Sequence, residues 1–229
     1  MKVGIVVFPG SNCDVDTRLA FEEVLGFSTI MLWHKEASTK DCDLVVLPGG
    51  FSYGDYLRSG AIARFAPIME AIVDHARRGG MVLGICNGFQ ILTEAGLLPG
   101  ALLRNNSRLF ISKDIYLKSC SALAPMSAPL DPNRPLRIPI AHGEGRYHVD
   151  DDGLKALQDQ DRIMFRYCDA QGQVSGTANP NGSLDNIAGI CSANGKVMGL
   201  MPHPERAVHP LLGLEDGLAM LQGLVNITV

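Results

Sequence analysis

The segment MVLGICNGFQ, residues 81–90, constrains the fold of this 229-residue chain more than any other stretch. A short apolar run leads into Gly84-Ile85-Cys86-Asn87-Gly88, and apolar residues at helical spacing follow it. Gly-x-Cys-x-Gly is the thiol counterpart of the Gly-x-Ser-x-Gly turn, which lifts a nucleophile out of a sharp strand-to-helix junction. The glycines leave space for nearby backbone, because they carry no β-carbon. The N-terminus of the following helix favours thiolate over thiol, so the pattern predicts that Cys86 is a nucleophile.

A cysteine between a strand and a helix is more often a small buried hydrophobe, so the prediction needs a partner base. Pro202-His203-Pro204-Glu205 follows an apolar run at 197–201. Pro204 favours extended backbone at His203, and residues two apart in extended chain point the same way. Glu205 is then able to orient the imidazole while its other nitrogen faces the nucleophile. For an isolated His-Pro-Glu a solvated surface loop is the usual interpretation, but its position after a core strand favours a Cys-His-Glu triad.

The alternation of apolar runs and helical patterns predicts an α/β fold. Apolar runs at 3–8, 44–47, 81–83 and 197–201 suit parallel strands that are covered on both faces. With 46% hydrophobic residues, the chain is expected to form one domain over residues 1–229, a doubly wound, mostly parallel, flavodoxin-like sheet. Strand-like segments at 109–117, 137–140 and 163–168 predict an antiparallel insertion after the nucleophile helix. The proline-rich segment 126–135 is expected to be a surface loop.

Residues 48–60, PGGFSYGDYLRSG, form a second glycine-rich segment directly after an apolar strand. Ligands bind at the carboxyl ends of strands in such sheets, where this loop and the Cys86 turn are both expected. Backbone N–H groups of Gly50 or Phe51, together with that of Asn87, are predicted to form an oxyanion hole. A plain turn is the alternative for this loop. The loop lacks the Gly-x-x-x-x-Gly-Lys-Ser/Thr pattern, so it does not imply ATP binding.

Charge and cysteine usage exclude several functional classes. The net charge of −4 without a dense basic block argues against nucleic acid or an anionic membrane as a partner. Six cysteines without a Cys-x-x-Cys spacing predict reduced thiols and a cytoplasmic location. The segment HGEGRYH, residues 142–148, fits no standard metal-ligand pattern, and we interpret it as a binding loop without a metal.

The Gly84 to Gln90 turn together with Pro202-His203-Pro204-Glu205 resembles the class I, triad-type glutamine amidotransferases. Within that family the segments 8–14, 49–55, 142–147 and 178–183 are similar to the glutaminase subunits of phosphoribosylformylglycinamidine synthase, and the similarity covers essentially the whole chain. The segment 123–134 matches no functional motif of that family.

This resemblance implies a role for each matching residue. Cys86 is the implied nucleophile, His203 the acid and base, and Glu205 the residue that orients His203. The residues implied to contact glutamine are Gln90, Asn106 and Ser107.

The implied reaction is hydrolysis of glutamine to glutamate and ammonia through a cysteine thioester. The ammonia is expected to reach a separate, large synthetase subunit that binds ATP and Mg, with a small accessory subunit, and that converts formylglycinamide ribonucleotide to formylglycinamidine ribonucleotide in de novo purine biosynthesis. No cofactor is expected in this chain itself. Two other classes remain open: a cysteine peptidase or deglycase-like protein, which tends to carry histidine where this chain has Asn87, and a non-catalytic flavodoxin-like binding module.

Overall fold

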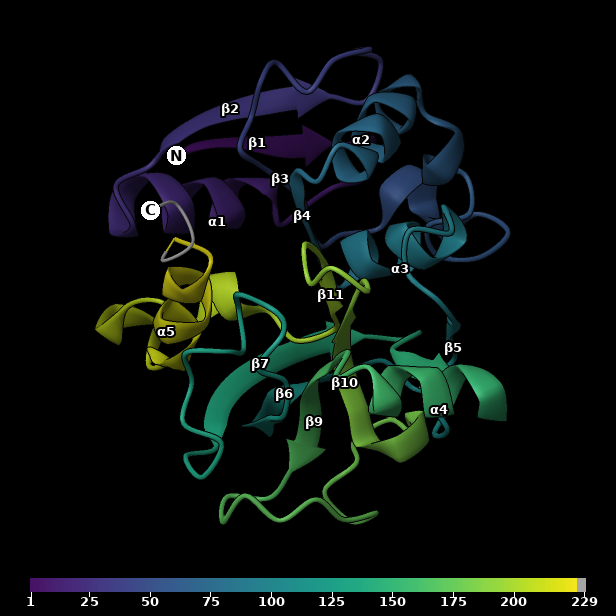
Figure 1. The fold of residues 1–229 in the computed structure, drawn as a ribbon, viewed down its shortest axis with the longest axis vertical. Helices are drawn as coiled ribbons and strands as arrows, with labels where there is room; N and C mark the ends of the chain where they lie inside the picture. The colour runs from purple at the N-terminus through teal and green to yellow at the C-terminus, as the bar shows by residue number, and fades with distance from the viewer. Residues whose placement is uncertain (226–229) are drawn as a thin grey trace.

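A computed structural model, which describes residues 1–225, contains one large twisted sheet of nine strands (Figure 1). Its strand order is β2-β1-β3-β4-β11-β10-β9-β6-β7. The bounds of these strands are β1 Lys2–Val7, β2 Ser28–Trp33, β3 Leu44–Leu47, β4 Met81–Ile85, β6 Ile111–Ser119, β7 Leu136–His142, β9 Ile163–Cys168, β10 Ile187–Cys191 and β11 Val197–Leu200. Two short strands, β5 (Ala101–Leu103) and β8 (Arg146–His148), form a separate antiparallel pair.

Strands β2, β1, β3, β4 and β11 run parallel, and all of them except β2 coincide with the predicted apolar runs. The first four lie in the upper half of Figure 1 together with α1 (Asp14–Leu19), α2 (Pro67–Arg77) and α3 (Asn87–Glu94). All residues of β3 and β11 are buried, because helices and loops cover both faces of this half of the sheet. The predicted doubly wound, mostly parallel α/β architecture is confirmed.

The antiparallel strands continue the same sheet in the lower half of Figure 1. In the order of the sheet, the first of them is β10, which pairs with β11. The helices α4 (Asp151–Asp159) and α5 (Asp216–Gly223) lie in the same half of Figure 1. Short 3-10 helices are Ser52–Asp55, Ala63–Phe65, Leu184–Asn186, Pro204–Arg206 and Pro210–Leu212, and a π-helical turn spans Ala20–Val24. None of the helices within residues 1–225 combines the length and apolar character needed to cross a bilayer.

Two sequence predictions in this half need correction. The strand predicted at 109–117 begins at Ile111 instead, because Leu109 and Phe110 are exposed ahead of it. The segment 126–135 is only partly a surface loop, since Met126 and Ser127 are buried. The Ser127 carbonyl accepts a hydrogen bond from Ser119 Oγ at 3.0 Å, which ties the start of this segment to β6.

Candidate active site

The nucleophile turn has the strand–turn–helix geometry that the sequence predicts. Cys86 lies between β4 and α3 with φ 51° and ψ −103°. A positive φ at a residue with a side chain is strained and persists only where the surrounding structure enforces it. Here the Cys86 N–H donates to the Leu200 carbonyl at 2.8 Å, which ties the turn to the end of β11. A β-carbon at Gly88 would overlap the Leu47 carbonyl, so the close backbone approach predicted for these glycines is confirmed.

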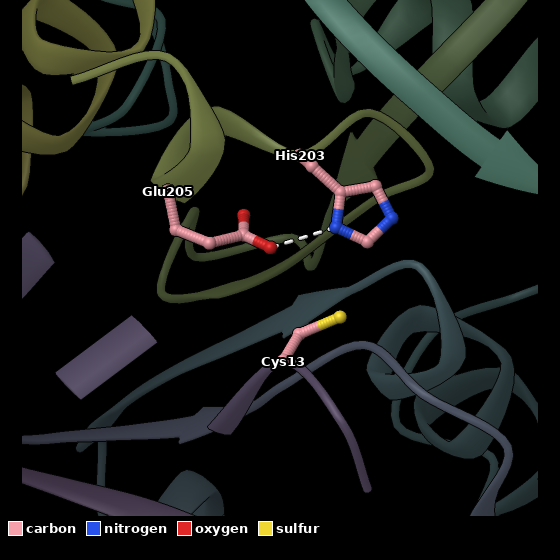
Figure 2. Close-up of side chains that lie close together, drawn as sticks. All are labelled: Cys13, His203 and Glu205. Atoms are coloured by element: carbon pink, nitrogen blue, oxygen red, sulfur yellow. Dashed lines mark hydrogen bonds and ion pairs between the residues drawn. The ribbon is translucent and has the colours of Figure 1, made fainter. Parts of the chain in front are cut away.

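His203 and Glu205 lie beyond the end of β11 and form a buried pair (Figure 2). His203 Nδ1 lies 2.7 Å from Glu205 Oε1, and both residues are almost inaccessible to solvent. An ionised carboxylate only accepts hydrogen bonds, so Nδ1 carries the proton. The sequence predicted extended backbone from His203 to Glu205, but Pro204–Arg206 forms a 3-10 turn instead. This turn brings the Glu205 side chain back to the imidazole ring of His203.

The electrostatics of this pair favour an imidazolium ion. Burial by itself lowers the pKa of His203, but the Glu205 carboxylate and the Cys86 and Cys13 sulfurs beside the ring outweigh it and raise the pKa well above its usual range. His203 Nε2 has no hydrogen-bond partner within residues 1–225. The structure therefore brings together Cys86, His203 and Glu205, which the sequence places up to 119 positions apart.

A cavity of about 390 Å³ opens beside Cys86 and carries charges of both signs. Its lining residues are Gly50, Phe51, Asp55, Ser59, Cys86, Gln90, Arg104, Arg108, Phe110, Ala141, His142, Gly143 and Glu144. A smaller cavity of about 140 Å³ shares Gly50, Phe51 and Cys86 with it and extends to Cys13 and His203. Cys86 therefore lines both cavities.

The charged side chains that line the larger cavity, Asp55, Arg104, Arg108 and Glu144, were not predicted from the sequence as site residues. Burial and the negative charge of Glu144 raise the pKa of Asp55, partly offset by hydrogen bonds from neighbouring side chains. Glu144 accepts a hydrogen bond from Ser59 Oγ at 3.0 Å and pairs with Arg104 at 3.5 Å. These charged residues could have been found from the sequence, because each lies in or next to a loop that follows a strand. Ligands bind at such loops in folds of this class.

Of the three residues implied to contact glutamine, only Gln90 lines this cavity. Its Nε2 donates to the Glu144 carbonyl at 2.6 Å, and its Oε1 accepts from Asn87 Nδ2 at 2.9 Å. Asn106 and Ser107 are exposed and lie outside the lining of this cavity. Arg104 and Arg108, which flank these two residues in the loop after β5, line the cavity instead.

The predicted oxyanion donors also need one correction. The Phe51 N–H donates to the Gly10 carbonyl at 3.0 Å, so it is not free in this geometry. Gly50 has φ 148°, a conformation that favours glycine, and lies at the cavity. The Asn87 side chain accepts from the Ser52 N–H at 3.1 Å and so ties the glycine-rich loop to α3. The backbone N–H groups of Gly50 and Asn87 remain as donors.

His142, at the end of β7, is a buried neutral base next to this site. Its Nδ1 lies 3.1 Å from Asn105 Oδ1, and burial, with a smaller contribution from the charge of His203, lowers its pKa to about 4.

We expect His142 to make the fold sensitive to acid. In the unfolded chain this histidine takes up a proton near pH 6.5, whereas in the folded chain it does so only near pH 4. The unfolded state is therefore favoured progressively as the pH falls below 6.5, by about 2.5 kcal/mol at pH 4.5. Chemical denaturation at pH 7.0 and 4.5 measures this, and the loss on acidification should be smaller in His142→Gln by that amount. The exposed His148→Gln serves as the control, and an equal loss in all three proteins would contradict the assignment.

Comparison with known proteins identifies the family of this chain. A family model described as the CobB/CobQ-like glutamine amidotransferase domain matches residues 1–213. The chain belongs to this glutamine amidotransferase family. Two curated relatives are phosphoribosylformylglycinamidine synthase subunits PurQ, one from Acaryochloris marina and one from a Synechocystis strain. The first is 52% identical, over 99% of this chain and 96% of the relative; the second is 56% identical, over 95% and 97% respectively.

Solved structures agree with the fold. A chain from the structure of PurLQS from Thermotoga maritima matches with a TM-score of 0.86 and 43% identity, over 98% of this chain and 97% of that chain. A glutamine amidotransferase from the same organism shares the fold, with a TM-score of 0.59 and 18% identity, over 99% of this chain and 81% of that chain.

Proposed function

We propose that this chain is the glutaminase subunit of a phosphoribosylformylglycinamidine synthase, which hydrolyses glutamine to glutamate and ammonia at Cys86. The observation that carries the proposal is the strained Cys86 turn next to the buried His203–Glu205 pair. Such a thiol beside an imidazolium is a nucleophile for acyl transfer. Membership of the glutamine amidotransferase family supports an amide as the substrate.

The reaction follows from the roles of these three side chains. The Cys86 thiolate attacks the side-chain amide carbon, and the backbone N–H groups of Gly50 and Asn87 stabilise the resulting oxyanion. His203 donates a proton to the departing nitrogen, so ammonia leaves and a γ-glutamyl thioester remains. The same imidazole then takes a proton from water, which attacks the thioester and releases glutamate and the thiolate. Glu205 holds Nδ1–H throughout and stabilises the imidazolium.

The charges around the larger cavity suit the other end of glutamine. Arg104 and Arg108 supply cations for the α-carboxylate, and Asp55 and Glu144 supply anions for the α-ammonium group. Arginine forms bidentate contacts with carboxylates, which would fix the orientation of the substrate. Gln90 acts indirectly, because both ends of its amide already bond to the protein and hold the Glu144 loop in place.

The ammonia is used by a separate synthetase in this proposal. The relatives are named as synthase subunits, and one structural match comes from PurLQS, which supports an assembly with other subunits. We assign ATP and Mg to a large synthetase subunit that converts formylglycinamide ribonucleotide to formylglycinamidine ribonucleotide in de novo purine biosynthesis, with a small accessory subunit alongside. The six unpaired cysteines support a reducing, cytoplasmic location.

A substrate comparison tests the proposal against its alternatives. The complex reconstituted with the synthetase subunits should release glutamate from glutamine, and Cys86→Ala should abolish that release. A cysteine peptidase would instead cleave peptide substrates, and a deglycase-like enzyme would act on glycated thiols or amines. Cleavage of those substrates without turnover of glutamine would overturn the proposal. Loss of glutamine-dependent synthesis in Cys86→Ala, with synthesis from added ammonia retained, would further support it.

A further inference from the structure

A second thiol, apart from the nucleophile, lies against the His203–Glu205 pair. Cys13 directly precedes α1, and Figure 2 shows its sulfur pointing towards the pair. One ligand atom from each of Cys13, His203 and Glu205 lies within 4.8 Å of the other two. All three residues are buried, with exposures of 2% or less. Thiolate sulfur, imidazole nitrogen and carboxylate oxygen are the ligands that zinc takes in proteins.

A second observation points to a cation at this place. Glu205 Oε2 is buried and has no hydrogen-bond partner within residues 1–225. A buried carboxylate oxygen without a partner is costly, and a cation would relieve that cost. Gly49 keeps the space open, since a β-carbon there would lie 2.7 Å from His203 Cε1 and 3.0 Å from Cys13 Sγ. A cavity of about 140 Å³, lined by Cys13 and His203, lies next to these ligand atoms.

We propose that Cys13, His203 and Glu205 bind zinc, and that bound zinc inhibits the enzyme. Of the two ring nitrogens, Nδ1 lies beside Glu205, so the metal takes the place of the proton on Nδ1 and is bound by the Glu205 carboxylate. Binding releases that proton and the thiol proton, because both ligands must be deprotonated. A divalent cation with one thiolate, one carboxylate and a neutral imidazole adds no net charge to the interior.

Arg206 is compatible with this site. Its Nη2 donates to Cys13 Sγ at 3.1 Å. Its Nε also contacts Asp16 at 3.2 Å, so the guanidinium keeps a counterion when the metal takes the sulfur. Zinc at this position withdraws His203 from proton transfer and removes Glu205 as its orienting partner. The inhibition rests on the proposed glutaminase function, whereas the binding of the metal does not.

Cobalt(II) titration tests the binding independently of activity, because a thiolate ligand to cobalt gives an intense charge-transfer absorption band in the near ultraviolet. The full chain and Cys86→Ala should each bind one cobalt ion and show this band. Cys13→Ser and Cys13→Ala should lack it, while Cys120→Ser, which removes a thiol elsewhere, should behave as the unmodified chain. The band persisting in both Cys13 variants, or lost only in Cys86→Ala, would overturn the site.

Zinc inhibition of glutamate release in the reconstituted complex tests the consequence. The rate of each protein is expressed relative to its own rate without metal. The zinc concentration that halves this rate should be at least about ten times higher for Cys13→Ser than for the unmodified chain or Cys120→Ser. Equal zinc sensitivity of Cys13→Ser and the unmodified chain would overturn the inhibitory role. If no protein, even without zinc, releases glutamate, the proposed function fails, and the cobalt titration still decides whether the site exists.

Discussion

Replacing Glu205 with glutamine should lower the rate of glutamate release in the complex by roughly 10²- to 10⁴-fold, as for orienting carboxylates in other triads. Glutamine has nearly the same size, so the buried site remains filled. Its carboxamide carries no charge, and Glu205 is the charge that contributes most to raising the pKa of His203. The variant therefore loses the imidazolium that protonates the departing nitrogen. The larger effect should fall on kcat, with KM for glutamine nearly unchanged, because Glu205 does not line the larger cavity.

Asp16→Asn provides the control for Glu205→Gln. Asp16, like Glu205, is a carboxylate that pairs with a nitrogen side chain. Its partner is Arg206, whereas the partner of Glu205 is His203. The rate of Asp16→Asn should stay within about threefold of the unmodified complex, as expected for a half-exposed ion pair of small energy. An unchanged rate in Glu205→Gln would show that the buried pair is structural only. Thermal unfolding of both variants checks that lost activity does not reflect lost folding.

The isolated chain should release glutamate at least about 10²-fold more slowly than the complex, since misplacement of catalytic groups by about 1 Å costs this much. One oxyanion donor predicted from the sequence, the Phe51 N–H, is bound to a backbone carbonyl in the chain by itself. The loop at 49–60 that carries it holds Tyr53, Asp55 and Leu57 at positive φ, with values of 54°, 54° and 73°. Strain of this kind suits a segment that changes conformation on assembly.

Glutamate release by the isolated chain and by the complex loaded with ATP and acceptor measures this difference, with Cys86→Ala as the blank. To the extent that docking to the synthetase raises the affinity for glutamine, linkage requires that bound glutamine strengthens docking by the same factor. A synthetase variant without ATPase activity separates docking from turnover of the acceptor. Equal rates for the isolated chain and the complex would mean that the site is fully assembled without its partners.

The sequence predicted those parts of the site that depend on local pattern. The Cys86 turn needs glycines at fixed positions, and His203 and Glu205 are only two residues apart. The contact of Cys13 with Arg206 joins residues 193 positions apart, and no periodicity or spacing encodes such a pair.

The cavity lining was harder to predict for a related reason. Asn106 and Ser107 were implied as ligand contacts, whereas Arg104 and Arg108 on either side of them line the cavity. Which residues of a loop face inwards depends on its backbone path, and here Asn105 fixes that path with hydrogen bonds to the His142 and Leu109 carbonyls.

The fold was predictable where strands are buried on both faces, because continuous apolar runs reveal them. The antiparallel strands were placed less well. Pro139 lies within β7, opposite Asp114, although proline lacks the N–H that a regular strand residue offers. That these strands extend the parallel sheet follows from the pairing of β10 with β11, which is a tertiary contact.

Cys86, and no other thiol, is expected to attack glutamine. A diazo-ketone analogue of glutamine, incubated with the complex and followed by peptide mass spectrometry, tests it most directly. Burial raises the pKa of Cys168 and of Cys191 to about 11, so neither should react. Cys13 is the most demanding comparison, because it lies beside the same histidine but does not line the larger cavity. We expect one adduct, on the peptide that contains Cys86, and we expect excess glutamine to prevent it. Equal labelling of Cys13 or Cys168, or labelling that glutamine does not prevent, would contradict it.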